Sequence, residues 1–156
     1  MAGEPRTAVD YAGIEQEIRL ALARIGDATD AMTRTVEILK ARVPDYTWVG
    51  IYRLFANELV LGPFLGRPSP HTRIPVGRGI CGAAAAEKTT IIVDDVSADS
   101  RYLACSAETQ SEIVVPIMRG SEVLGEIDID SDRPAAFGAE DKQLLESVAS
   151  VLAEKI

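Results

Sequence analysis

The segment Glu126 to Asp130 reads EIDID, and it constrains the fold of this chain more than any other stretch. Strand side chains point alternately to opposite faces of a sheet, so the three acids share one face while Ile127 and Ile129 share the other. The isoleucines predict a hydrophobic layer on their side. The acids need solvent, protons or a cation, because a buried carboxylate without a partner raises its pKa or costs several kcal/mol.

Further strand-like segments surround this one. Tyr46 to Leu54 leads through FAN into ELVLG, and SEIVVPIM leads through RGS into VLGEIDIDSD, which predicts two antiparallel hairpins. Two shorter pieces, Thr72 to Ile74 and Thr89 to Val96, also have strand character. The sequence therefore predicts about six strands that are connected mainly by hairpins.

Helical patterns lie at both ends of the chain. Ala8 to Ile25 carries apolar residues at helical spacing, and a second helix, capped by Asp27 or Thr29, ends before Pro44. Gly79 to Glu87 is a helix of small residues, and an amphipathic helix runs from Ala139 or Glu140 to the C-terminus. We expect one α+β domain, with the terminal helices on one face of the sheet and loops that enclose a small pocket on the other.

The overall charge narrows the classes of function. A net charge of −8 disfavours binding to nucleic acid or to an anionic membrane surface. The chain has neither a signal peptide pattern nor an apolar run long enough to span a membrane, so we expect a cytoplasmic protein. Its two cysteines, Cys81 and Cys105, do not have zinc-ligand spacing, and we expect neither a metal nor a bound cofactor.

The acidic row defines the candidate binding site. Glu112 begins the strand that should pair with the EIDID segment, so a fourth acid would lie nearby. Antiparallel sheets can expose one face to water, and the acids would then be only a solvated surface. Alternatively, they form a pocket wall for a ligand with an ammonium group, and one carboxyl shares or donates a proton. The pattern alone leaves both interpretations open.

The cysteines and the single histidine are the other candidates for chemistry. Cys81 lies in GRGICG at the start of a predicted helix, where the helix dipole would lower the pKa of its thiol. It is equally consistent with a small side chain packed between helix and sheet. Cys105 and His71 lie on polar loops and have ordinary loop roles as alternatives. GRGICG also fits GxGxxG, but the βαβ unit that a dinucleotide site requires is missing.

Several separated motifs, taken together, indicate a family. They are WVGIYR, ELVLGPFLG, TRIPVGRGICG, LACSAETQSEIVVPI and LGEIDIDS, followed by a helix near FGAEDKQLLE. From about Tyr46 to the C-terminus the chain resembles the GAF-domain free methionine-(R)-sulfoxide reductases. The resemblance implies a single GAF domain over residues 1–156, usually a homodimer, which reduces free methionine sulfoxide rather than the protein-bound residue.

The resemblance also implies roles for individual residues. Cys105 matches the nucleophile, whose thiolate attacks the sulfoxide sulfur and becomes a sulfenic acid. Cys81 would then form a disulfide with Cys105, and thioredoxin or another thiol would reduce it. The residues that would bind substrate are Glu112, Asp128 and Asp130, with Trp48 and His71 as further candidates.

Two positions depart from the family pattern. His71 replaces the family's resolving cysteine, and Glu126 is an acid where an apolar residue is usual. These departures favour a different class of function, a non-catalytic GAF module that binds a small amine-bearing ligand and signals through its terminal helices. A third interpretation is a metal site formed by His71, Cys81, Cys105 and one acid, although the irregular spacing of these residues gives it little support.

Overall fold

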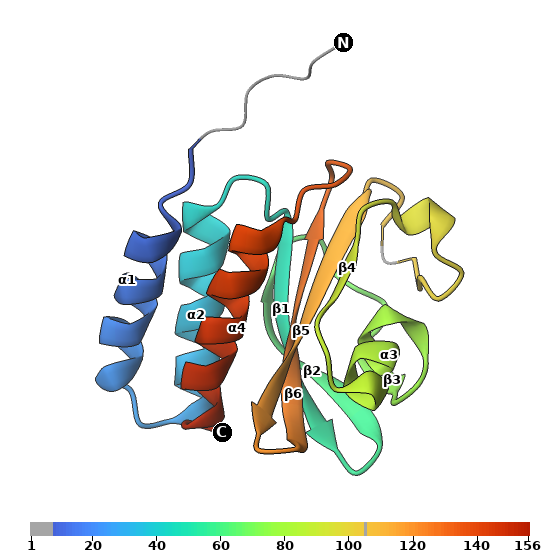
Figure 1. Ribbon diagram of the computed structural model, residues 1–156. Coiled ribbons are helices and arrows are strands. Elements are labelled where there is room, and N and C mark those ends of the chain that lie inside the picture. The colour runs from blue at the N-terminus through green and yellow to red at the C-terminus, as the bar shows by residue number, and fades with distance from the viewer. Residues whose placement is uncertain (1–7, 105) are drawn as a thin grey trace.

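The computed structural model describes residues 8–104 and 106–156, and these form three layers around one sheet. Figure 1 shows the long helices on one face of the sheet and the short helix with long loops on the other. The long helices are α1 (Tyr11–Ala23), α2 (Ala28–Arg42) and α4 (Ala139–Ala153), and the short one is α3 (Gly79–Glu87). The predicted α+β class and the placement of the terminal helices are confirmed.

The sheet has six strands in the order β3-β2-β1-β6-β5-β4, and every neighbouring pair is antiparallel. The strands are β1 (Trp48–Phe55), β2 (Glu58–Leu65), β3 (Arg73–Pro75), β4 (Ile91–Val93), β5 (Ser111–Arg119) and β6 (Glu122–Ser131). The two predicted hairpins are β1–β2 and β5–β6. The first and last hairpin strands, β1 and β6, pair with each other at the centre of the sheet.

Local capping explains where several elements begin or end. Asp10 accepts a hydrogen bond from the Gly13 amide, so α1 starts later than its apolar pattern suggests, and Asp27 caps α2 in the same way. β4 is shorter than the predicted strand, because Asp95 accepts a hydrogen bond from the Ser97 amide and starts a 3-10 turn, η1 (Val96–Ala98). These side-chain bonds compete with strand pairing for the same backbone.

Both faces of the sheet are buried. Ile127 and Ile129 pack with the three long helices in the larger hydrophobic cluster. The hydrophobic layer predicted for the isoleucine face of the EIDID segment is therefore present. On the opposite face Tyr52, Ile80 and Cys81 belong to a second cluster under α3. The acidic row of β6 therefore faces a second, smaller core rather than open solvent.

The close approach of the two central strands depends on one glycine. A Cβ at Gly125 would lie 2.2 Å from the carbonyl oxygen of Tyr52 on β1. Only glycine permits this contact, because a backbone atom cannot move aside as a flexible side chain can. None of the helices in the described part of the chain is long and apolar enough to cross a membrane.

Candidate active site

The pairing of β1, β6 and β5 places the acids in rows on the face that α3 covers. Glu112 on β5 lies opposite Asp130 on β6, as the hairpin pattern predicts. Across three strands the rows are Trp48, Asp130 and Glu112; Gly50, Asp128 and Val114; and Tyr52, Glu126 and Pro116. Antiparallel register thus brings four carboxyl groups from two strands into one small area.

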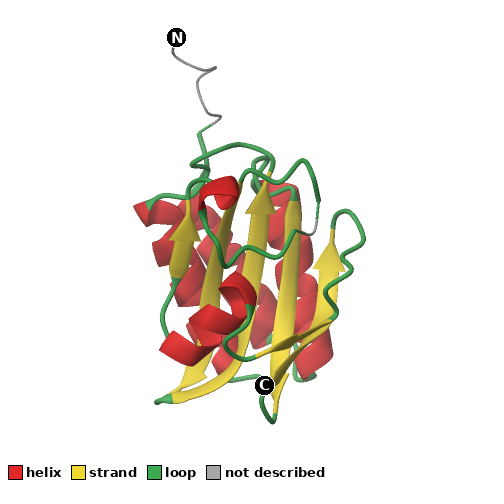
Figure 2. Cartoon of the chain, turned by 90° about the vertical axis from the view of Figure 1, so that its right-hand side faces the viewer, coloured by secondary structure: helices red, strands yellow, loops and turns green. Residues whose placement is uncertain are grey.

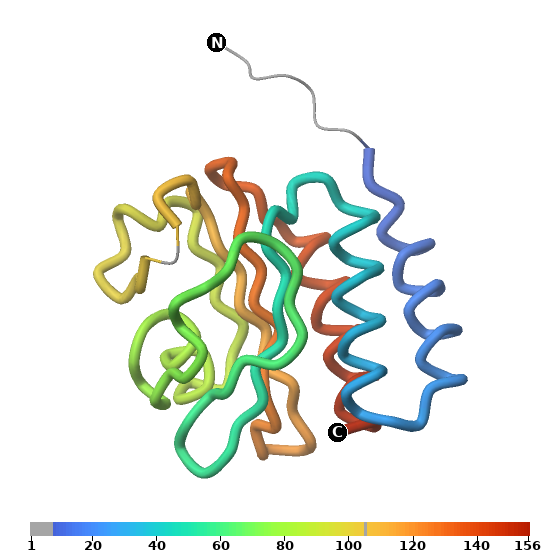
Figure 3. The backbone as a smooth tube through the Cα atoms, turned by 180° about the vertical axis from the view of Figure 1, so that it is seen from behind, coloured from blue at the N-terminus to red at the C-terminus, as the bar shows by residue number. Residues whose placement is uncertain are grey.

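All four carboxyl groups are buried. Their exposed fractions are 5% for Glu112, 0% for Glu126 and 3% each for Asp128 and Asp130. Figure 2 views the molecule from this side and shows α3 and long loops in front of the sheet. Figure 3 shows the green β2–α3 connection and the yellow loop after η1 on the side of the sheet opposite the long helices. The interpretation of the acids as a solvated surface is therefore wrong.

Burial and mutual repulsion change the protonation of these acids. Burial raises the pKa of Glu112 well above its usual range, and the nearby charges of Asp128 and Asp130 raise it further. Burial, followed by the charge of Asp128, likewise raises the pKa values of Glu126 and Asp130. Glu112 lies within hydrogen-bonding reach of both Asp128 and Asp130. These carboxyl groups therefore share protons, which makes one of them a candidate proton donor.

The pKa of the Cys81 thiol is not lowered, as its position at a helix start predicts it to be. Burial raises the pKa of the Cys81 thiol well above its usual value, and the charges of Asp128, Glu126 and Glu112 add to this effect. The helix dipole is outweighed because desolvation and three nearby acids all oppose a thiolate. Cys81 is 5% exposed, as expected for a small side chain packed between α3 and the sheet.

A small cavity lies where the acids, the thiol and the covering loops meet. Its lining includes Tyr52, His71, Cys81, Glu112 and Asp128, and its volume is about 20 Å³. A cavity of this size holds about one water molecule. His71, a candidate substrate contact, therefore does lie at the site, whereas the cavity is too small to admit an amino acid while the loops are in this position.

Two loops cover the cavity, and hydrogen bonds tie the first of them to strand β1 and to the second loop. The Tyr52 hydroxyl donates to the His71 carbonyl oxygen at 2.7 Å, and Nε2 of His71 lies 3.1 Å from the Ala104 carbonyl oxygen. The predicted nucleophile, Cys105, lies outside the described residues. Its chain neighbours do approach the site, since Leu103 lines the cavity and Ala104 contacts His71.

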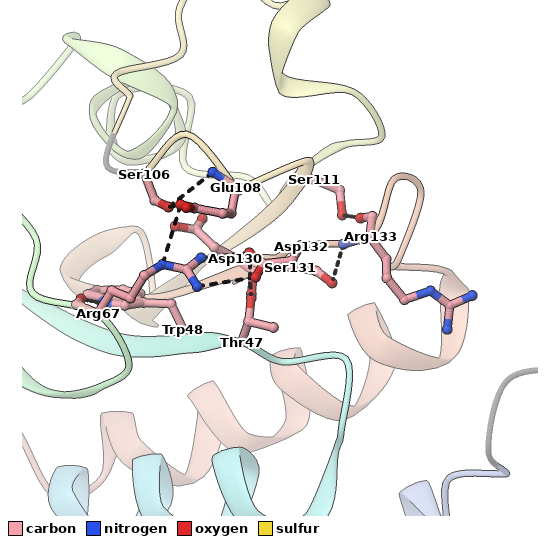
Figure 4. A network of polar contacts seen from close by, with 10 residues as sticks. All are labelled: Thr47, Trp48, Arg67, Ser106, Glu108, Ser111, Asp130, Ser131, Asp132 and Arg133. Carbon is pink, nitrogen blue, oxygen red and sulfur yellow. Dashed lines mark hydrogen bonds and ion pairs between the residues drawn. The ribbon is translucent and has the colours of Figure 1, made fainter.

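Arg67 connects the same loops at the edge of the sheet (Figure 4). Its guanidinium donates to Asp132 at 2.7 Å and lies 3.9 Å from Glu108 on the second loop. Its backbone carbonyl accepts a hydrogen bond of 2.9 Å from the indole of Trp48. Neither Arg67 nor Tyr52 was predicted as a site residue. Arg67 lies on a loop and carries no signal in the sequence, whereas the period-2 spacing of Tyr52 from Trp48 could have placed it on the acidic face.

Trp48 forms a wall beside the acids. It is 6% exposed, its ring stacks on Phe64 with centroids 5.7 Å apart, and a Cβ at Gly50 would lie 2.3 Å from that ring. The benzo ring of the indole thus lies against Gly50, the cross-strand neighbour of Asp128. Of the candidate substrate contacts, His71, Glu112 and Asp128 line the cavity, whereas Asp130 and its cross-strand neighbour Trp48 lie beside it in the same sheet row as Glu112.

Comparisons with known proteins agree with this architecture. The GAF domain family model matches residues 27–156. The chain is 36% identical to the free methionine-R-sulfoxide reductase of Escherichia coli over 94% of this chain and 87% of that protein. The chain belongs to the GAF-domain free methionine-R-sulfoxide reductase family.

Solved structures support the same placement. The chain superimposes on free methionine-R-sulfoxide reductase from Neisseria meningitidis, solved with its substrate, with a TM-score of 0.90 and 35% identity. That match covers 99% of this chain and 95% of the other. A protein described as a GAF sensor, from Burkholderia vietnamiensis, matches with a TM-score of 0.87 and 33% identity over 93% of this chain and 92% of that one.

Proposed function

We propose that this chain reduces free methionine-(R)-sulfoxide to methionine. The observation that carries the proposal is the convergence of Glu112, Asp128 and Asp130, the three acids that the family resemblance assigns to substrate, in one buried cluster. Membership of the reductase family adds support. A buried group of acids that share protons is suited to a small ligand with a positive charge.

The acids would select a free amino acid by its ammonium group. An ammonium forms charge-assisted hydrogen bonds with carboxylates and favours their ionised form. A second carboxyl that keeps its proton can donate it to the sulfoxide oxygen. In a protein the nitrogen of the same residue is a neutral amide, which would leave the buried acids without a counter-charge. The site would therefore discriminate against the protein-bound residue.

Cys105 would carry out the first chemical step. Its thiolate attacks the sulfoxide sulfur, the oxygen passes to the cysteine as a sulfenic acid, and methionine leaves. The Cys81 thiol then attacks the sulfenic sulfur, forming a disulfide and releasing water, and a dithiol such as thioredoxin reduces this disulfide. Because burial and nearby acids oppose its thiolate form, we expect attack by Cys81 to be the slow step.

Substrate entry requires the covering loops to open. The cavity of about 20 Å³ has room for about one water, so the contacts of His71 with Ala104 and of Arg67 with Glu108 must separate. Closure over bound substrate would exclude water from the sulfenic acid step. We further propose that the active protein is a homodimer, as the family resemblance implies.

A coupled assay tests the proposed function. The full chain is mixed with thioredoxin, thioredoxin reductase, NADPH and free methionine-(R)-sulfoxide, and wild type is compared with Cys105→Ser and Cys81→Ser. We expect wild type to turn over, Cys105→Ser to be inactive, and Cys81→Ser to release one methionine per chain before it stalls. Turnover by Cys105→Ser at the wild-type rate would exclude the mechanism.

A non-catalytic GAF sensor is the second candidate. The similarity to the described GAF sensor and the replacement of a resolving cysteine by His71 favour it. In that case methionine sulfoxide or another small amine would bind to the acids without being reduced. Binding detected by calorimetry in the absence of any methionine release would favour the sensor.

A further inference from the structure

Three side chains from separate elements meet at the floor of the cavity. The Sγ atom of Cys81 on α3 and one carboxyl oxygen each of Glu112 on β5 and Asp128 on β6 all lie within 4.8 Å of one another. All three residues are buried and line the same cavity. The proposed reaction uses the two acids to hold an ammonium group, but it gives this combination of thiol and carboxyl groups no role of its own.

Asp128 of this cluster and its strand neighbours Glu126 and Asp130 have carboxyl oxygens without hydrogen-bond partners among the described residues. Asp128 is 3% exposed, and its Oδ1 accepts no hydrogen bond of normal geometry. Glu126 is fully buried and its carboxyl faces the Cys81 thiol, but neither of its oxygens has a partner of normal geometry within the described part of the chain. Unpartnered buried carboxyl oxygens are costly, so they indicate a site where a positively charged group completes the structure.

We propose that Cys81, Glu112 and Asp128 bind a thiophilic divalent cation, with Zn²⁺ as the best fit, at a site that overlaps the proposed ammonium site. Zinc takes four ligands and accepts sulfur together with carboxylate oxygen. The cavity has room for one water as the fourth ligand. Zinc–ligand distances of about 2.0–2.3 Å place tetrahedral ligand atoms roughly 3.5 Å apart, so ligand atoms that now lie within 4.8 Å of one another would move together by at most about 1.3 Å.

The shape and chemistry of the site disfavour the other common cations. Mg²⁺ retains several waters, and Ca²⁺ takes six to eight oxygen ligands, which a cavity of about 20 Å³ does not provide. A thiolate ligand selects softer metals such as zinc. His71 is outside the ligand cluster found among the described residues, and its Nε2 lies against the Ala104 carbonyl oxygen. The proposed ligands therefore differ from those of the metal site considered from the sequence, which used His71 and both cysteines.

Zinc binding at this site would have a functional consequence. This consequence rests on the proposed reductase activity, whereas the metal site itself does not. Zinc and the substrate ammonium group would both require Glu112 and Asp128, so zinc would compete with methionine sulfoxide. A zinc-bound Cys81 thiolate would also be unavailable to attack a sulfenic acid. Metal binding would hold the enzyme in an unreactive form.

Cobalt titration of the reduced, chelator-treated full chain tests the site directly. Co²⁺ substitutes for zinc, and a thiolate ligand gives it a charge-transfer absorption band in the near ultraviolet. We expect one Co²⁺ per chain, with a band that excess Zn²⁺ removes. Cys81→Ser should abolish the band and weaken zinc binding at least about 10-fold in calorimetry, whereas Cys105→Ser should keep both. Loss of the band in Cys105→Ser but not in Cys81→Ser would overturn the assignment.

Acid variants provide the second measurement. Asp128→Asn should weaken zinc binding by a similar factor, while Glu122→Gln, on the exposed start of the same strand, should leave it unchanged. Circular dichroism of each variant establishes that it is folded. Absence of zinc binding by an active wild-type reductase would refute this inference alone. Zinc binding by a chain that releases no methionine would refute the proposed function and leave the metal site intact.

Discussion

Glu112 on β5 lies directly opposite Asp130 on β6, and the two buried carboxyl groups are within hydrogen-bonding reach of each other. Two carboxylates in such a position repel each other strongly if both are ionised, so the pair retains a proton. Their neighbours Asp128 and Glu126 are in the same situation, with pKa values raised first of all by burial. Some of these carboxyl groups therefore stay protonated until a cation binds in place of the protons.

This protonation predicts how stability depends on pH. An acid whose pKa is raised on folding binds its proton more tightly in the folded than in the unfolded chain. Its contribution to stability is fully present below the ordinary carboxyl pKa of about 4 and is lost as pH rises through the folded-state value. We therefore expect urea unfolding to show a stability that decreases as pH rises above the ordinary carboxyl pKa, by up to about 1.4 kcal/mol per pH unit for each such group.

Glu126→Gln isolates one of these groups. The amide cannot ionise, so the variant should lose less stability than wild type as pH rises above the ordinary carboxyl pKa. Glu122→Gln, at an exposed position of β6, serves as the control and should follow the wild-type curve. Equal slopes for Glu126→Gln and wild type would show that Glu126 does not hold a proton in the folded chain.

Asp130→Asn tests the proposed recognition of the ammonium group. Asparagine preserves size but cannot carry the negative charge, and a hydrogen bond to a charged group contributes about 1.5–3 kcal/mol. We expect the dissociation constant for methionine sulfoxide to rise about 10- to 100-fold, as measured by calorimetry with Cys105→Ser to prevent turnover. Unchanged affinity would remove the acids from the substrate site.

Much of this site could be predicted from local sequence. Alternation in EIDID placed the acids on one face, and the RGS turn placed Glu112 beside them. The helix Gly79–Glu87 has the predicted boundaries because glycines precede it and Lys88, in the left-handed conformation with φ of 55°, ends it. These features depend on residues that are close in the chain, where spacing fixes geometry.

Burial and protonation could not be predicted in the same way. The acids are buried because loops distant in the sequence fold over them, and these loops are held by contacts such as that of Tyr52 with the His71 carbonyl. Separation along the sequence also explains why the expectation of a lowered pKa for the Cys81 thiol was wrong. The helix dipole is visible in the local sequence, whereas the three acids that outweigh it come from β5 and β6.

Gly50→Ala tests the position of Trp48. The added Cβ would lie 2.3 Å from the indole ring, which must move away from Gly50. We expect a loss of about 1–3 kcal/mol in unfolding free energy and a shift in the fluorescence of Trp48, the only tryptophan in the chain. Gly26→Ala, where a Cβ meets nothing within 4 Å, is the matched control and should change neither quantity.

Opening of the covering loops can be followed through the buried thiol of Cys81. In a Cys105→Ser background, a thiol reagent reaches Cys81 only when the loops separate, so its rate of reaction reports the open population. Arg67 joins the two loops through Glu108 and is anchored to the end of β6 through Asp132, and partly exposed ion pairs of this kind contribute about 0–1 kcal/mol. Arg67→Ala should therefore accelerate labelling of Cys81 by up to about 5-fold.

Two controls separate loop opening from general loss of stability. Arg73→Ala removes a comparable exposed pair with Glu58, which lies on β2 and β3 away from the second covering loop, and it should not alter the labelling rate. Added salt should accelerate labelling of the Arg67 parent toward the rate of Arg67→Ala, because salt screens the same ion pairs. If Arg67→Ala and its parent react equally fast at low salt, the Arg67 contacts do not hold the loops closed, and the hydrogen bond between His71 and Ala104 becomes the remaining tie to test.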